Sequence, residues 1–170
     1  MTSAELLQDA YGRISEIVHR TLAGIDPAVL AFRPDPDANS IAWLVWHLTR
    51  VQDDHISEVA GVEQRWAAAG WHGRSGLDIA PEETGYGHSS AAVARLAAIP
   101  LDVLVGYHDD VAAHTRTYVG SLRDADLDRI VDTSWDPPVT LGVRLVSVIA
   151  DNLQHAGQAA YVRGLADRAR

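Results

Sequence analysis

Apolar side chains recur at every third or fourth position along most of this chain, which is the spacing of one face of an α-helix. A first amphipathic helix is predicted over residues 2–23. Its apolar positions are Leu6, Leu7, Ala10, Tyr11, Ile14, Ile17, Val18 and Leu22. Thr2 or Ser3 can cap its start, and Gly24 fits its end. A linker rich in proline and aspartate, residues 33–37, then leads to the second apolar run.

The second helix is predicted to run from a cap at Asn39 or Ser40 to about Ala60. Its apolar stripe consists of Ile41, Leu44, Val45, Leu48, Val51, Ile56 and Val59. The polar positions that this stripe leaves mainly for solvent are Arg50, Gln52, Asp53 and Glu58. His47 lies on the inner stripe, where a polar side chain needs a hydrogen-bonding partner or a metal ion.

A third helix is expected to begin near Ser89 or Ser90, to be interrupted at Pro100 and to continue over residues 101–122. The last and longest helix is predicted over residues 139–165. Its buried stripe is expected to consist of Leu141, Leu145, Val148, Ile149, Asn152, Ala156, Ala159 and Val162. Together the four patterns predict an all-α fold, a four-helix bundle in a single domain spanning residues 1–170.

The connection between the second and third helices, residues 61–90, is the least regular part of the chain. It carries tryptophans, glycines and two histidines, His72 and His88. Two interpretations stand side by side: the aromatic side chains cover an open end of the core, or the segment is a lid that shapes a substrate pocket. Trp135, just before the last helix, is also available for burial.

Candidate chemistry is concentrated in the last helix, where Asp151 and His155 are separated by four residues. Side chains at that spacing lie on one helix face roughly 6 Å apart, which suits two ligands of one metal ion. A carboxylate with imidazoles is an acceptable ligand set for zinc, nickel, manganese or iron. The best third ligand is His47, although each inward histidine alone is equally compatible with a hydrogen-bonded core residue.

The composition narrows the classes of function. The net charge is −9 at pH 7 with no lysine, which argues against nucleic acid and anionic membrane surfaces as partners. There is no cysteine, so disulfides, thiolate nucleophiles and cysteine-bound zinc are excluded, and a metal must be held by His, Asp or Glu. The start of the chain lacks signal-peptide features, and no apolar run reaches about 18 residues. A cytoplasmic location is therefore expected.

Four segments carry a resemblance to a known family. They are residues 43–55 (WLVWHLTRVQDDH), 84–88 (TGYGH), 135–143 (WDPPVTLGV) and 154–161 (QHAGQAAY). Taken together, over nearly the whole chain, they resemble the DinB/YfiT-like metalloenzyme superfamily, in particular its actinobacterial-type branch. The resemblance implies a four-helix bundle with a divalent metal ion, zinc or nickel by preference, at one end of the core.

The resemblance also assigns expected roles. By motif, His47 matches the family's ligand on the second helix and His155 its last ligand, while Asp151 stands where a middle histidine is usual. Gln158 matches a glutamine that supports the last ligand, and Trp43 is counted with it among the cofactor-binding residues. The aspartate departs from the three-histidine pattern, and it lowers the Lewis acidity of the ion relative to a third imidazole.

Characterised relatives depend on thiols: mycothiol-dependent maleylpyruvate isomerase, and transferases that act with bacillithiol, mycothiol or glutathione. The resemblance therefore implies a metal-dependent S-transferase that uses a low-molecular-weight thiol and a small-molecule substrate. Asp54, His55 and His88 are the candidates for a general base. A non-catalytic binding or stress-response bundle and a metal-dependent hydrolase are the alternatives. An exposed apolar bundle face would favour a homodimer, but no sequence feature decides the oligomeric state.

Overall fold

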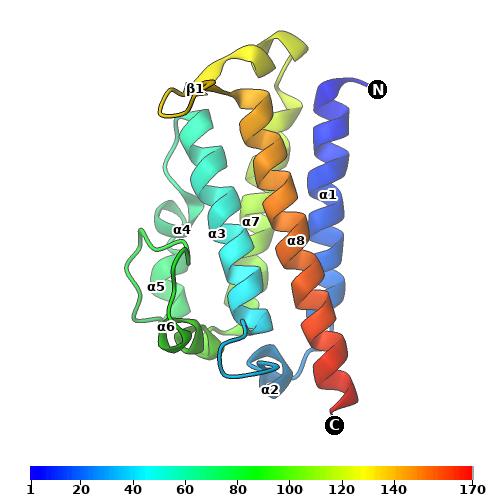
Figure 1. Cartoon of the computed structure of the whole chain (residues 1–170), viewed down its shortest axis with the longest axis vertical. Coiled ribbons are helices and arrows are strands. Elements are labelled where there is room, and N and C mark those ends of the chain that lie inside the picture. Colours follow the sequence, from blue (N-terminus) through cyan, green and yellow to red (C-terminus); the bar gives the residue numbers. More distant parts are fainter. Residues whose placement is uncertain (170) are drawn as a thin grey trace.

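The computed structural model describes residues 1–169 and is dominated by four long helices (Figure 1). The α-helices are α1 (Ser3–Leu22), α2 (Pro27–Leu30), α3 (Ile41–Ala60), α4 (Arg65–Ala68), α5 (Trp71–Ser75), α6 (Ser90–Arg95), α7 (Leu101–Gly120) and α8 (Leu141–Arg168). Two 3₁₀ helices, η1 (Leu96–Ala98) and η2 (Asp124–Asp128), and two short antiparallel strands, β1 (Ile130–Asp132) and β2 (Val139–Thr140), complete the described chain. The predicted all-α four-helix bundle is confirmed.

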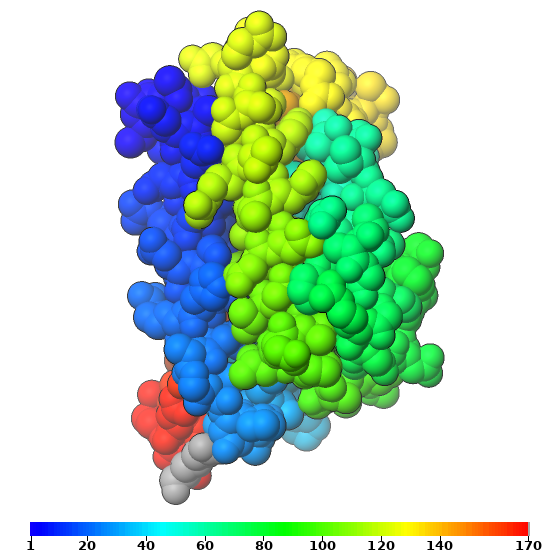
Figure 2. Space-filling model, turned by 180° about the vertical axis from the view of Figure 1, so that it is seen from behind, coloured from blue at the N-terminus to red at the C-terminus, as the bar shows by residue number. Residues whose placement is uncertain are grey.

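The four long helices form a ring in the order α1, α7, α3, α8, each packed against the next. Helices α1 and α8 run in one direction, and α3 and α7 run in the other (Figure 1). Because α3 and α7 are parallel, the chain between them must return along the whole bundle. Seen from the opposite side, α7 lies between α1 and this returning connection (Figure 2).

Local sequence signals explain where the helices begin and end. The Thr2 hydroxyl caps α1 and forms a capping box with Glu5, and the Ser40 hydroxyl accepts from an amide in the first turn of α3. Gly61 ends α3 in the left-handed conformation, φ 69°. The last helix begins at Leu141 rather than at residue 139, because residues 139–140 pair with β1 and the Thr140 hydroxyl caps the helix.

The prediction that Arg50, Gln52 and Asp53 face solvent is wrong, since each side chain is at most 2% exposed. Glu58 alone of the four predicted solvent positions is exposed. The apolar stripe described only the face of α3 that meets the other long helices. The returning connection packs on the outer face of α3 and buries Arg50 and Asp53 there. Gln52 is buried instead by contacts with α7 and α8.

Arg50 and Asp53 hold that connection in place. The Arg50 guanidinium donates to the carbonyl oxygens of Pro81 and Glu83 at 3.0 Å each, and it lies 3.5 Å from the Asp53 carboxylate. Asp53 in turn accepts from the two backbone amides that open α4, at 2.8 Å. A buried ion pair with this many hydrogen bonds is satisfied on both sides, so it fixes the connection to α3.

A second buried polar layer crosses the bundle core. The Asn152 amide donates to Gln52 at 2.7 Å, and Gln52 donates to the Thr115 hydroxyl at 2.8 Å. Asn152 is buried, as expected from its place in the stripe of the last helix, and it belongs to this layer rather than to the group around Asp151.

Trp135 lies outside the bundle core. It is 68% exposed, because it lies in the loop of the β1–β2 hairpin rather than over the core, where burial was expected.

Within residues 1–169 no single helix is long and apolar enough to cross a membrane. Only the pair Ser90–Ala98 and Leu101–Gly120, bent by 100°, reaches that length and composition.

Candidate metal centre

The structure brings His47 of α3 together with Asp151 and His155 of α8. One ligand atom from each of the three side chains lies within 4.8 Å of the other two. The two α8 side chains share a face through their four-residue spacing, and His155 Nε2 lies 3.6 Å from Asp151 Oδ1. The group lies at the middle of α8, along its contact with α3, rather than at one end of the bundle as the family resemblance implies.

His47 is held in one tautomer by the returning connection. Its Nδ1 lies 2.5 Å from the backbone oxygen of Thr84, and because a carbonyl only accepts, Nδ1 carries the proton and Nε2 keeps a free lone pair. The Trp43 ring stacks on the imidazole at 4.5 Å. Burial lowers the pKa of His47 and outweighs the Thr84 hydrogen bond, which alone would raise it. The lowered pKa favours the neutral imidazole, which is the form that binds metals.

The segment after Thr84 passes close over the imidazole. Gly85 adopts φ 104°, and a Cβ atom there would lie 2.7 Å from His47 Nδ1, so only glycine fits the backbone conformation and the space. Tyr86 follows, with its ring centroid 5.2 Å from that of His47 and the two rings nearly perpendicular. Burial raises the pKa of the Tyr86 phenol, and the charges of Asp151 and Asp54 add to this, so the hydroxyl stays protonated.

His155 is oriented from its own helix. Its Nδ1 lies 2.9 Å from Oε1 of Gln158, one turn along α8, which leaves Nε2 free to face Asp151 and His47. Hydrogen bonds of this kind, donated by the N–H of the second ring nitrogen, are the usual support of metal-binding histidines.

The donor set fits a divalent cation. Asp151 Oδ2 is buried and has no hydrogen-bond partner among the described residues, although a buried carboxylate oxygen is costly without one. Two imidazoles with free Nε2 atoms lie beside it. Two nitrogens and one carboxylate oxygen are ligands that zinc, nickel, manganese and iron accept, and three protein ligands leave coordination positions open.

Two other predicted site residues, His88 and Asp54, already have hydrogen-bonding partners. Both ring nitrogens of His88 are occupied: Trp43 Nε1 donates to Nδ1 at 3.1 Å, and Nε2 lies 2.9 Å from Glu83. His88 therefore positions Trp43 and has no free nitrogen to offer a substrate. Asp54 accepts from Gln64 at 2.6 Å and lines an outer pocket rather than the cavity beside Asp151.

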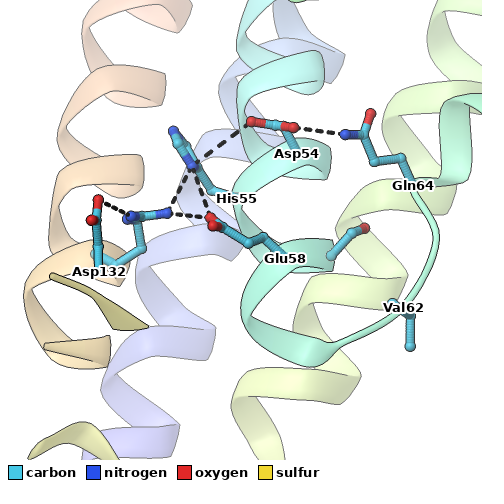
Figure 3. A pocket seen from close by; sticks show the side chains of 8 residues that line it. Asp54, His55, Glu58, Val62, Gln64 and Asp132 are labelled. Atoms are coloured by element: carbon cyan, nitrogen blue, oxygen red, sulfur yellow. Dashed lines mark hydrogen bonds and ion pairs between the residues drawn. The ribbon is translucent and has the colours of Figure 1, made fainter. Parts of the chain in front are cut away.

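His55 lies between two hollows of the surface. One is a cavity of about 200 Å³ that it shares with Asp151 and Tyr86. The other is an outer pocket of about 560 Å³, shown in Figure 3 with its carboxylates Asp54, Glu58 and Asp132.

Arg144 of α8 also belongs to this region, although it was not among the residues predicted from the sequence. Its guanidinium donates to His55 Nδ1 at 3.1 Å, to Glu58 at 2.5 Å and to Asp132 at 3.1 Å. A signal was present in the sequence, because Arg144 precedes Asp151 by two helical turns and so lies on the same face. Its contacts tie α3, α8 and the β1–β2 hairpin together beside the candidate site.

Comparisons with known proteins agree with this fold and indicate a family. A family model described as mycothiol-S-transferase matches residues 6–168. A crystal structure described as a conserved protein from Enterococcus faecalis has a TM-score of 0.89 and 31% sequence identity, over 96% of each chain. No curated protein sequence matches the chain significantly.

Proposed function

This chain belongs to the mycothiol-S-transferase family, of DinB/YfiT-like type, and we propose that it is a metal-dependent enzyme that transfers a low-molecular-weight thiol to an electrophilic small molecule. The observation that carries the proposal is the unpartnered Asp151 oxygen, buried beside two imidazoles that each present a free Nε2. Such a group of acceptors needs a cation, and zinc and nickel are the favoured ions.

The composition indicates where the reacting sulfur atom comes from. The chain has no cysteine, so the nucleophilic sulfur has to come from a co-substrate. His47, Asp151 and His155 would hold a divalent ion, which would lower the pKa of such a thiol so that it is thiolate near neutral pH. Mycothiol is the thiol that the family name favours.

The protein's own residues supply position and exclusion of water. Thr84 and Gln158 fix the tautomers of His47 and His155, so both ligands face the same point. Trp43 packs flat against His47 and shields it from solvent. Residues 84–86 close over the imidazole, and Tyr86 lines the cavity that reaches Asp151.

The test is conjugation of monobromobimane by zinc- or nickel-loaded protein, with mycothiol and with glutathione, followed by fluorescence. We expect turnover that requires thiol and is lost in His155→Ala. Gln154→Leu is the matched control, because Gln154 is exposed on the same helix and donates only to the backbone of its own helix at Ala150. Absence of thiol-dependent turnover with both metals and both thiols would overturn the proposal, and turnover of an ester substrate without thiol would indicate a hydrolase.

A further inference from the structure

The cavity beside Asp151 has walls of two kinds. Its lining residues are Val51, His55, Tyr86, Ser147, Val148 and Asp151, around about 200 Å³. The valines make it partly apolar, and the Ser147 hydroxyl is already committed to the carbonyl oxygen of Val143 at 2.9 Å. His55 and Tyr86 are therefore the side chains that can donate hydrogen bonds to a molecule in this cavity.

The contacts of Arg144 decide which His55 nitrogen carries the proton. A guanidinium only donates, so His55 Nδ1 accepts from Arg144 and the neutral ring has its proton on Nε2. Nε2 has no partner within residues 1–169. In Figure 3 one ring nitrogen of His55 is engaged on the side of Glu58 and Asp132, and the other points away from them. The ring is thus fixed as an N–H donor.

Tyr86 supplies the second donor. Its hydroxyl makes no hydrogen bond in the described part of the chain, although its ring lies against that of His47. The flanking glycines, Gly85 and Gly87, have φ values of 104° and 69°, which L side chains rarely adopt. The backbone of this segment therefore places the tyrosine beside His47 and in the wall of the cavity.

Resting on the proposed thiol transfer, we propose that this cavity binds the electrophile and that His55 Nε2–H and the Tyr86 hydroxyl hold the oxygen of an α,β-unsaturated carbonyl compound. Two donors that line one cavity with partly apolar walls match a conjugated ketone or aldehyde, whose oxygen gains negative charge during attack. Donors already in place for that charge stabilise the transition state more than the ground state.

The step balances without an oxidant or reductant. The thiol loses its proton to solvent, and its sulfur forms a bond to the β-carbon of the substrate. The carbon–carbon π pair shifts so that the carbonyl oxygen carries the negative charge, held by His55 and Tyr86. The α-carbon then takes a proton from water, and the net result is addition of S–H across the double bond.

The first test needs neither thiol nor turnover. The dye 4-(dimethylamino)cinnamaldehyde is a conjugated aldehyde whose visible absorption moves to longer wavelength when its oxygen accepts hydrogen bonds. We expect this shift with wild-type protein as purified and again after chelation, and a smaller shift in Tyr86→Phe and in His55→Phe. Tyr161→Phe is the control, because Tyr161 is 66% exposed and lines neither hollow.

The second test compares two electrophiles with mycothiol. With 2-cyclohexen-1-one, Tyr86→Phe is expected to lower kcat by roughly 10²-fold, as removal of one oxyanion donor does. With monobromobimane, whose displacement places no charge on a carbonyl oxygen, the loss should be clearly smaller, and an equal loss with both electrophiles would overturn the assignment of Tyr86.

An absent dye shift in wild type, or an equal shift in all variants, overturns the proposal. A dye shift that is lost in the variants, together with no thiol-dependent turnover of either electrophile, supports the carbonyl-binding cavity and refutes the proposed thiol transfer.

Discussion

The backbone oxygen of Thr84 lies 2.5 Å from Nδ1 of His47 and fixes the side of the imidazole that faces Asp151 and His155. A residue of the irregular connection thereby sets the tautomer of a ligand on α3. The connection itself is held to α3 by the buried Arg50–Asp53 pair. The candidate site thus depends on a loop as well as on two helices.

Gly85 tests this dependence. Gly85→Ala places a methyl group 2.7 Å from His47 Nδ1 in a backbone conformation unfavourable to alanine, so it should displace the Thr84 carbonyl. We expect zinc affinity, measured by competition with a chromogenic chelator, to fall about 10- to 100-fold. The free energy of unfolding should fall by about 1–3 kcal/mol.

Gly87→Ala is the matched control for that substitution. Gly87 has φ 69° but no atom within 4 Å of an added Cβ. It should therefore cost about 1–2 kcal/mol in stability from backbone strain and leave zinc affinity unchanged. Equal affinities in the two variants would show that the Thr84 contact does not support His47.

Gln158 should support the other histidine. Gln158→Leu removes the acceptor of His155 Nδ1–H, so the ring loses its fixed tautomer and orientation. Zinc affinity is expected to fall about 10-fold or more. Gln154→Leu, which removes an exposed amide one turn earlier, should bind zinc like wild type, and a similar loss in both variants would refute the assignment.

The buried ion pair should carry much of the stability of the connection. Arg50→Ala leaves the Asp53 carboxylate buried beside empty space and frees the carbonyls of residues 81 and 83. We expect the free energy of unfolding in urea to fall by about 3–5 kcal/mol, with faster proteolysis within residues 61–89. Arg13→Ala removes an exposed pair with Asp9 and should change neither measurement.

Stability should fall in mild acid because of His108. Burial lowers the pKa of this histidine from 6.5 to about 4, so between these values the unfolded chain binds a proton that the folded protein does not. The free energy of unfolding therefore decreases as the pH falls from 6.5 towards 4, by about 2–3 kcal/mol at pH 4.5. Urea unfolding of His108→Gln should lack this component, and an identical pH dependence would contradict the assignment.

The sequence predicted the candidate site well where the spacing of residues along a helix determines which side chains share a face. The four-residue spacing of Asp151 and His155, and the place of His47 on an apolar stripe, were enough to select the three side chains that the structure brings together. Their role as metal ligands stays a prediction, as do the cytoplasmic location and the homodimer.

The sequence was less informative where the path of residues 61–89 determines which side chains are buried. Periodicity along α3 could not show that residues 61–89 cover its polar face, so Arg50 and Asp53 were assigned to solvent. The support from Thr84 comes from a backbone oxygen, which no side-chain pattern reveals. Arg144 could have been found from its two-turn spacing to Asp151, because helical geometry alone places both on one face.

Elemental analysis of purified protein without a histidine tag, beside His155→Ala, tests the metal site most directly. We expect about one zinc or nickel ion per wild-type chain, as in other sites with three protein ligands. The variant should be folded, as judged by circular dichroism, and should have lost the ion. A wild-type protein free of metal even after incubation with zinc, nickel and manganese, or a variant that retains the ion, would contradict the account.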